Sequence, residues 1–359
     1  MKVTLIGLPN SGKTTVFNAL TRGRAETSAY ASGRLEPNVM MVKVPDPRLE
    51  VLAEMYHPKK ITYADVQYVD IAGLGGESHK SRGLPPALLN YLATADALLY
   101  VVRAFEDVTV PHPSGSLDVA RDVAALDLEL AFSDLSIIER RLERLETDIQ
   151  KIAKDREKRI HERELLQRLK TALEAGTLIR DVDLTPDDEW LLRGYQFLTA
   201  KPALIVINIG EDQIQCPPQF DYPHRKSDVI AFCGKLEAEL AQMEDAEARV
   251  FMDDLGIRQP ARDRVIAQSY KLLGLISFIT IGPEEVRAWP IRQGTSAVDA
   301  AGVVHSDMQR GFIRAEVVRF EDLVAAGSLA EARKRGTLKV EGKHYIIQDG
   351  DVCHFLFNV

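Results

Sequence analysis

The chain has 359 residues, of which 45% are hydrophobic and 27% charged, and its net charge is −8. This balance is ordinary for a globular protein of two or three domains and excludes a globally basic nucleic-acid-binding surface. The three scattered cysteines lack metal-ligand spacing and indicate a reducing compartment. No apolar run is long enough to cross a bilayer, and the N-terminal one is too short for a signal peptide, so we expect a cytoplasmic protein without membrane contact.

A phosphate-binding loop lies near the amino end. Residues 7–14 read GLPNSGKT, which matches the pattern GxxxxGK[ST]. The apolar residues 1–6 before it predict a buried strand, and residues 15–20 after it predict a helix. Between such a strand and helix, the glycines let main-chain amides surround phosphate oxygens, and the helix N-terminus adds partial positive charge. A chance glycine-rich turn would lack this setting.

Each position of the loop has an expected role. Lys13 is expected to reach the outer phosphates of ATP or GTP, and Thr14 to offer its hydroxyl to Mg²⁺. The residues expected to hold the nucleotide are Gly7, Asn10, Ser11, Gly12, Lys13, Thr14 and Thr15.

Three further apolar runs, residues 66–70, 97–102 and 202–208, predict strands of a parallel sheet covered on both faces. Asp70 ends the first of them, where a carboxylate can hold a Mg²⁺-bound water, and the amide of Gly73 can bind the terminal phosphate. The next residue is Leu74, which has no donor or acceptor to orient an attacking water.

The segment between the last two strands is predicted to be helical. Apolar residues alternate at steps of three and four from Leu135 to Ile152, a charged turn is expected over residues 154–164, and the stripe resumes from Leu165 to Leu173 before Gly176. We interpret this as two antiparallel helices forming a protruding arm. Ordinary surface helices packed on the core are the alternative.

The arm carries a local excess of positive charge. Residues 151–170 contain eight Lys and Arg against four Asp and Glu, a net +4, which leaves −12 for the rest of the chain. The region is therefore the best candidate for RNA contact, although mixed-sign runs are often simply solvated helix surfaces.

The segment after the last predicted strand is the candidate base-reading loop, and it reads Asn208-Ile209-Gly-Glu211. GTPases usually carry NKxD here, with the Asp accepting hydrogen bonds from guanine. Glu211 is one methylene longer and would crowd guanine, whereas adenine loses less, so the loop weakens the case for strict GTP use. Glu211 could also be an ordinary exposed acidic residue.

The chain changes character near residue 273. Strands are predicted at 275–281, 286–291, 311–318, 344–348 and 352–357, and a helix begins within 294–301. This mixture predicts a small α+β domain.

Together these motifs resemble the YchF-type Obg-like ATPases of the Obg-related P-loop GTPase superfamily, and the chain looks like a divergent member of that family. The resemblance covers nearly the whole chain and is densest in the C-terminal segments EVRAW (285–289), GFIRAEV (311–317) and QDGDV (348–352). It implies an α/β P-loop nucleotide domain over 1–118 and 201–272, a helical coiled-coil arm inserted at 119–200, and a β-grasp-like TGS domain over 273–359. It also implies ATP hydrolysis, often in preference to GTP, and association with ribosomes or ribosomal RNA, with no DNA partner.

The resemblance also implies site residues. Asn208, Ile209 and Glu211 occupy the positions of the family's base loop, and His112 occupies that of a histidine proposed to position the attacking water. Arg34 stands where the family has a Mg²⁺-binding Thr. Because arginine cannot bind a cation, either Ser32 substitutes or Arg34 contacts the γ-phosphate as an internal arginine finger.

The leading hypothesis is therefore a slow, Mg²⁺-dependent NTPase that acts as a conformational switch, with His112 and Arg34 as catalytic candidates. The lost Thr motivates a second hypothesis, a nucleotide-responsive binding protein with little or no hydrolysis. A P-loop kinase acting on a small molecule is the third, but no arginine-rich lid is recognisable.

Overall fold

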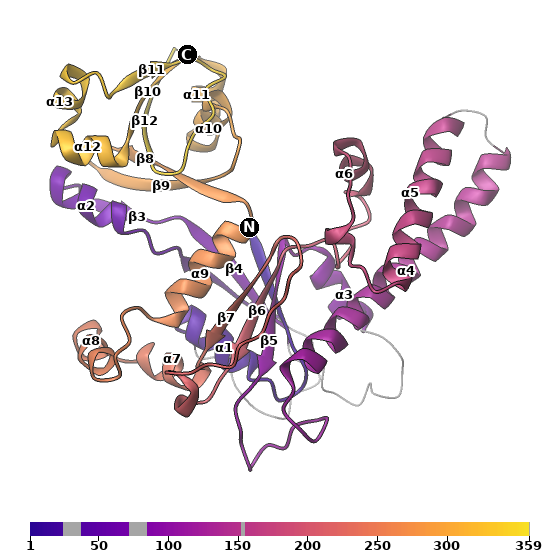
Figure 1. Cartoon of the computed structure of the whole chain (residues 1–359). Helices are drawn as coiled ribbons and strands as arrows, with labels where there is room; N and C mark the ends of the chain where they lie inside the picture. Colours follow the sequence, from indigo (N-terminus) through magenta and orange to yellow (C-terminus); the bar gives the residue numbers. More distant parts are fainter. Residues whose placement is uncertain (24–36, 72–84, 152–154, 359) are drawn as a thin grey trace. The chain divides into compact units, whose positions relative to one another are not determined.

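The computed structural model describes residues 1–23, 37–71, 85–151 and 155–358, which divide into two compact units (Figure 1). The first unit contains residues 1–40 and 67–265, and the second contains residues 41–66 and those from 266 onward. Within the described ranges, no helix has the length and apolar character needed to span a membrane.

The sheet of the first unit follows from the buried apolar runs of the sequence. Its strand order is β2-β4-β1-β5-β6-β7, and the pairs from β4 to β7 are parallel. Every residue of the central strands β5 and β6 is buried. The strands predicted at 1–6, 66–70, 97–102 and 202–208 are confirmed, and the bounds are β1 (Lys2–Ile6), β2 (Asn38–Lys43), β4 (Asp65–Asp70), β5 (Ala97–Arg103), β6 (Ala203–Asn208) and β7 (Ser227–Phe232).

The parallel order decides where a ligand site can form. The carboxyl ends of β1, β4, β5 and β6 meet at one edge, which is where open α/β sheets bind ligands. The helices of the first unit outside the arm are α1 (Lys13–Thr21), α3 (Pro86–Ala93), α7 (Gly234–Leu240) and α8 (Asp245–Asp254), and α9 (Ala261–Leu272) begins in the first unit and ends in the second.

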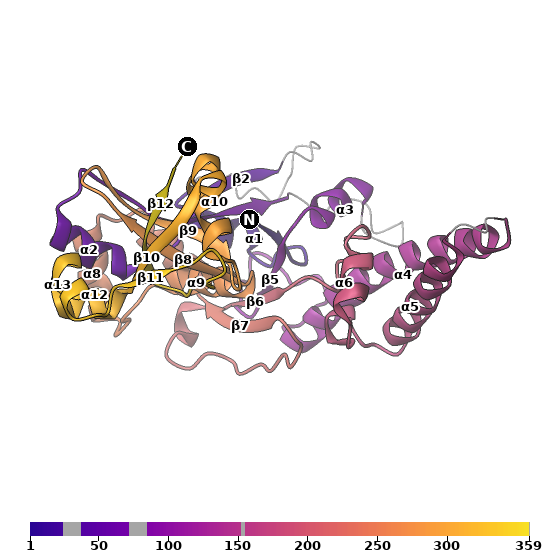
Figure 2. The same cartoon turned by 90° about the horizontal axis from the view of Figure 1, so that it is seen from above.

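The helical arm consists of α4 (Val119–Lys151) and α5 (Arg156–Glu174), which lie side by side in both views (Figures 1 and 2). Their apolar seam is confirmed, since Ile138 and Leu145 of α4 share a core with Leu166 and Leu169 of α5. The 3-10 turn η2 (Ile179–Asp181) and helix α6 (Pro186–Leu192) follow.

The charged turn predicted at 154–164 is wrong for most of its length, because α5 already begins at Arg156. Arg141 of α4 donates to both carboxylate oxygens of Glu162, at 2.8 and 2.9 Å, and Tyr195 also donates to that carboxylate. A polar contact thus continues the seam where the sequence lacks apolar residues. Ile152 and Lys154 lie outside the described residues.

The second unit is an α+β layer structure built on the sheet β11-β10-β12-β8-β9-β3. Ala297, Ala300 and Ala301 of α10 pack into a core with strand residues such as Phe278. The strands are β3 (Lys60–Thr62), β8 (Leu275–Ile281), β9 (Glu285–Arg292), β10 (Phe312–Arg319), β11 (Lys339–Glu341) and β12 (Asp351–Phe357). The helices are α2 (Pro47–Tyr56), α10 (Ala297–Val304), α11 (Ser306–Arg310), α12 (Phe320–Ala326) and α13 (Leu329–Lys334).

Four of the five C-terminal strands predicted from the sequence are confirmed. The strand predicted at 344–348 is wrong, because only Ile346 pairs there, in an isolated bridge with Ser296. The segment instead forms turns that present main-chain groups to α10, and the carbonyl of Tyr345 accepts from the amide of Ala297 at 2.7 Å.

Residues 41–66 belong to the second unit although they lie early in the sequence. Strand β3 pairs in parallel with β9, and Leu49 and Leu52 of α2 are fully buried. Arg48 binds Asp46 at 2.8 Å and Asp349 at 2.9 Å, which fixes the start of α2 to the turn before β12. The domain bounds expected from the sequence stay a prediction.

Candidate nucleotide-binding site

The phosphate-binding loop has the backbone geometry of an anion-binding concavity. Asn10 and Gly12 adopt left-handed conformations, with φ of 63° and 81°, on either side of Ser11. Such an alternation points successive amides toward one point, and Gly12 is also the N-cap of α1. The amides of the loop and the positive end of the helix therefore converge on the same space.

Close packing requires glycine at both ends of this loop. A Cβ on Gly7 would lie 2.6 Å from the carbonyl oxygen of Val101, and one on Gly12 would lie 2.3 Å from Nδ2 of Asn208. These distances are too short for real contacts, so the two glycines of the motif let the loop lie against β5 and β6.

Lys13, Thr14 and Asp70 meet at the ends of the loop and β4. Lys13 Nζ lies 2.7 Å from Asp70 Oδ1, and Thr14 Oγ1 donates to Asp70 Oδ2 at 2.9 Å. Lys13 also donates to the carbonyl of Ile71. Asp70 is only 1% exposed, so its negative charge is balanced by the ammonium group of Lys13.

This cluster has the chemistry of a Mg²⁺ site. A carboxylate and a hydroxyl are the hard oxygen ligands that Mg²⁺ prefers, and in nucleotide sites phosphates and waters supply the remaining ones. The ammonium group of Lys13 already acts as a cation at the Asp70 carboxylate, which demonstrates that this buried position accommodates positive charge. Thr14 and Asp70 therefore fit the ion predicted from the sequence.

Asn208 ties the phosphate-binding loop to the loop after β7. Its Nδ2 donates to the carbonyl of Ser11 at 3.0 Å, and its Oδ1 accepts from the amide of Gly234, also at 3.0 Å. The side chain is 3% exposed. One Nδ2 hydrogen and one Oδ1 lone pair are left for a nucleotide.

The other two residues predicted to frame the base have different surroundings. Ile209 is 6% exposed and its side chain packs in the apolar core. Glu211 begins the 3-10 turn η3 (Glu211–Gln213) and is exposed, and its Oε2 accepts from Lys235 Nζ at 3.1 Å. The structure thus brings Asn208 and Glu211 to the carboxyl edge of the sheet and turns Ile209 inward.

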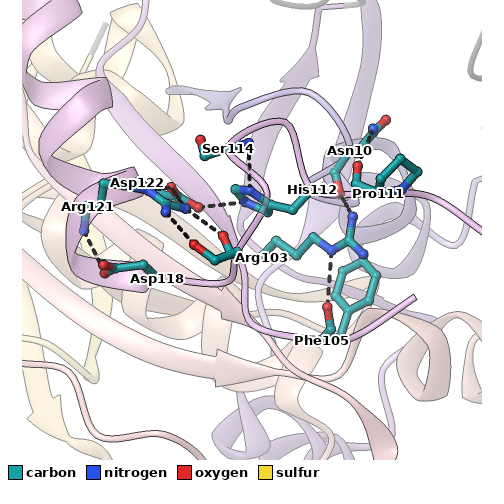
Figure 3. A network of polar contacts seen from close by, with 10 residues as sticks. Asn10, Arg103, Phe105, Pro111, His112, Ser114, Asp118, Arg121 and Asp122 are labelled. Atoms are coloured by element: carbon teal, nitrogen blue, oxygen red, sulfur yellow. Dashed lines mark hydrogen bonds and ion pairs between the residues drawn. The ribbon is translucent and has the colours of Figure 1, made fainter. Parts of the chain in front are cut away.

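A buried arginine supports the loop, and the sequence indicated it only as part of a family motif. Arg103 is 3% exposed and ends β5 (Figure 3). Its guanidinium donates to the carbonyls of Phe105, Asp107 and Asn10 at 3.1, 3.4 and 3.5 Å, and lies 4.5 Å from the centre of the Phe105 ring. It therefore joins the phosphate-binding loop to the segment that follows β5.

His112 lies on that segment, with both ring nitrogens bonded (Figure 3). The amide of Ser114 donates to Nδ1 at 3.1 Å, so Nδ1 is an acceptor, and Nε2 donates to Asp122 Oδ2 at 2.9 Å. The side chains of His112 and Asp122 are only 6% and 5% exposed. The carbonyl of Pro111 accepts from Asn10 Nδ2 at 3.3 Å, which brings the segment against the phosphate-binding loop.

Asp122 is a residue that the sequence analysis missed. It lies in the first turn of α4, and Arg121 donates to its second oxygen from Nε at 3.0 Å and from an η nitrogen at 2.8 Å. No motif pointed to it, since an acidic residue in the first turn of a helix is common. Arg34, Gly73, Leu74 and Ser32 lie outside the described residues.

The chain is similar to known proteins over its whole length. A family model described as a 50S ribosome-binding GTPase matches residues 2–209, and the YchF GTPase C-terminal model, described as a protein of unknown function (DUF933), matches residues 275–358. The Ribosome-binding ATPase YchF of Bacillus subtilis is 40% identical over 364 residues, covering 99% of this chain and 98% of that protein. The chain belongs to the YchF family.

Other relatives agree over the same length. The Ribosome-binding ATPase YchF of Escherichia coli O157:H7 is 38% identical and covers 100% of this chain and 99% of that protein. The solved YchF GTPase of Schizosaccharomyces pombe superposes with a TM-score of 0.87 at 28% identity, covering 99% of this chain and 97% of that one. The resemblance and the fold class predicted from the sequence are thereby confirmed.

Proposed function

We propose that this protein is a Mg²⁺-dependent NTPase that hydrolyses ATP, accepts GTP at the same site with lower affinity, and acts as a ribosome-associated switch in the cytoplasm. The observation that supports this most directly is the convergence of Lys13, Thr14 and Asp70 at the phosphate-binding loop. The names of the relatives, which describe ribosome-binding ATPases, support the reaction and the partner.

In this proposal each group of the cluster changes partner when nucleotide binds. Lys13 would leave Asp70 for the outer phosphates, and Thr14 and Asp70 would hold Mg²⁺. The ion would supply positive charge to the phosphate oxygens. The amides of residues 7–15 hold the phosphates, and Asn208 with Glu211 lies next to the base.

Hydrolysis is expected to be slow because the proposed catalytic groups position the attacking water poorly. His112 can orient water only if it gives up its bond to Ser114 or Asp122, since both ring nitrogens are occupied. Arg34 is proposed to contact the γ-phosphate and Gly73 to bind it through its amide. Leu74 cannot orient water, so slow intrinsic turnover is expected.

In this proposal the helical arm and the TGS-like C-terminal domain communicate the nucleotide state of the protein to the ribosome or its RNA. The buried pair of His112 and Asp122 supports this proposal for the arm, because it fixes the segment beside the phosphate-binding loop to the first turn of α4. We expect no partnership with DNA or membranes.

The pair of His112 and Asp122 also favours one alternative, because it occupies a ring nitrogen that would otherwise be available to orient water. The alternative is a nucleotide-responsive binding protein that hydrolyses little or nothing. Phosphate release from ATP with purified protein, with and without ribosomes, distinguishes the two. Slow Mg²⁺-dependent release that Lys13→Ala abolishes supports the NTPase. Tight ATP binding without release, even with ribosomes, supports the binding protein, and phosphate transfer to a metabolite would indicate a kinase.

A further inference from the structure

An ion pair lies beside the residues that approach the base. Lys235 Nζ is 3.1 Å from Glu211 Oε2. Glu211 follows β6, and Lys235 lies in the first turn of α7 after β7, so the pair joins the ends of two neighbouring strands. The side chains of Lys235 and Glu211 are 69% and 49% exposed, which leaves them accessible to a ligand.

Two hydrogen bonds connect this pair to the phosphate-binding loop. Gly234, the residue before Lys235, donates its amide to Asn208 Oδ1, and Asn208 Nδ2 donates to the carbonyl of Ser11, each at 3.0 Å. A nucleotide whose phosphates lie in the loop would therefore extend its base toward the strand ends that carry Glu211 and Lys235. The hydrogen bond to Glu211 raises the pKa of Lys235, so its ammonium group stays charged.

We propose that Lys235 determines which nucleobase is accepted, by occupying one of the two carboxylate oxygens of Glu211. The inference rests on the proposed function, because it requires a nucleotide at this site. It assigns the selectivity to a side chain outside the loop of residues 208–211.

The argument follows from the hydrogen-bonding edges of the two bases. Guanine presents two adjacent donors, N1–H and the exocyclic amine, and a free carboxylate accepts both at once. Lys235 takes one lone pair of Oε2, and its positive charge lowers the acceptor strength of the carboxylate, so Glu211 binds the paired donors of guanine more weakly than a free carboxylate would. Adenine presents a single amine donor beside the N1 acceptor, so it loses less than guanine does.

The sign of the effect is therefore defined. Removing the ammonium group frees both oxygens of Glu211, which strengthens guanine binding and places a bare carboxylate against the N1 lone pair of adenine. The pair contributes little to folding because both side chains are exposed, so a variant that lacks it is expected to fold.

The test is the ratio of ATP to GTP affinity, measured by titration of both labelled nucleotides with Mg²⁺ present. Lys235→Met is expected to shift the ratio toward GTP by about two- to fivefold, because guanine can displace Lys235 at no more than the cost of opening an exposed ion pair. Lys235→Arg, which can keep the contact, should retain the wild-type ratio. In a Glu211→Gln background, Lys235→Met should produce no shift.

A matched control exists on the arm, where Lys170 Nζ forms an exposed pair with Glu139 at 2.8 Å. Lys170→Met should leave the ratio unchanged. An unchanged ratio in Lys235→Met, an equal loss of both nucleotides, or a shift toward ATP overturns the inference while the proposed function stands. If the wild-type protein binds neither nucleotide, the proposed function fails instead.

Discussion

Substituting Gly12 by alanine tests how the phosphate-binding loop is held in shape. Gly12 has φ of 81°, a conformation that costs an L-residue about 1–2 kcal/mol. The new Cβ would also lie 2.3 Å from Asn208 Nδ2, so Asn208 must move. Its bonds to Ser11 and Gly234 contribute about 0.5–1.5 kcal/mol each. The expected total loss of folding stability is about 2–5 kcal/mol.

Gly176 provides the control, because its φ is 82° and a Cβ added there would have no neighbour within 4 Å. Gly176→Ala therefore carries the backbone strain alone, and Gly12→Ala should exceed it by about 1–3 kcal/mol, the two hydrogen bonds of Asn208. Hydrogen exchange should reveal faster exchange over residues 205–240 in Gly12→Ala only. ATP affinity should fall by roughly 5- to 150-fold.

Equal exchange in the two variants would refute this reasoning, and so would ATP affinity in Gly12→Ala within about twofold of wild type. Either result would mean that Asn208 can shift without loss and does not hold the two loops together. A loss of affinity without faster exchange over 205–240 would place the defect in the loop backbone alone.

Three other changes have defined outcomes. Asp70→Asn should lower nucleotide affinity at least about tenfold when Mg²⁺ is present, because a metal ligand is lost. Without Mg²⁺ the affinity should not fall, because the substitution releases Lys13. Equal effects in both titrations would contradict the assignment of Asp70 as a metal ligand. Asp122→Asn should raise kcat for ATP without changing KM, because it weakens the bond that His112 must give up to orient water, and unchanged or lower turnover would contradict that role. Burial raises the pKa of Asp134 to about 6 from 3.8, so the folded state binds its proton more tightly than the unfolded state. The stability from this group is then full below about pH 4 and is lost as pH rises through about 6, by about 3 kcal/mol. Unfolding of wild type and Asp134→Asn across about pH 3–8 measures it, and parallel profiles would be the negative result.

The strands and the phosphate-binding loop could be predicted because their signals are local. The runs at 97–102 and 202–208 are apolar throughout, as strands buried on both faces must be. The phosphate-binding loop could be predicted because the residue types and spacing from Gly7 to Thr14 are enough to specify its backbone conformation. Asp70 could be found because it ends another predicted strand, at residues 66–70.

What the sequence did not reveal depends on contacts between distant residues. The pairing of β3 with β9 joins residues about 225 apart, and nothing in either segment specifies the partner. The charged segment at 154–164 is predicted to be a turn, but most of it is helical, and Glu162 within it pairs with Arg141 on the neighbouring helix. The bonds that occupy both nitrogens of His112 come from Ser114 and Asp122, which carry no recognisable motif.

The membership of residues 41–66 in the second unit has a practical consequence for dissecting this protein. A shortened chain ending at residue 272 would keep α2 but lose the sheet that covers Leu49 and Leu52, and β3 would lose its neighbour β9. Such a fragment would display bare apolar surface and an unsatisfied strand edge, both of which promote aggregation. Its failure to bind ATP would therefore report a misfolded remnant, and point substitutions in the intact polypeptide are the sounder way to separate the contributions of the two units.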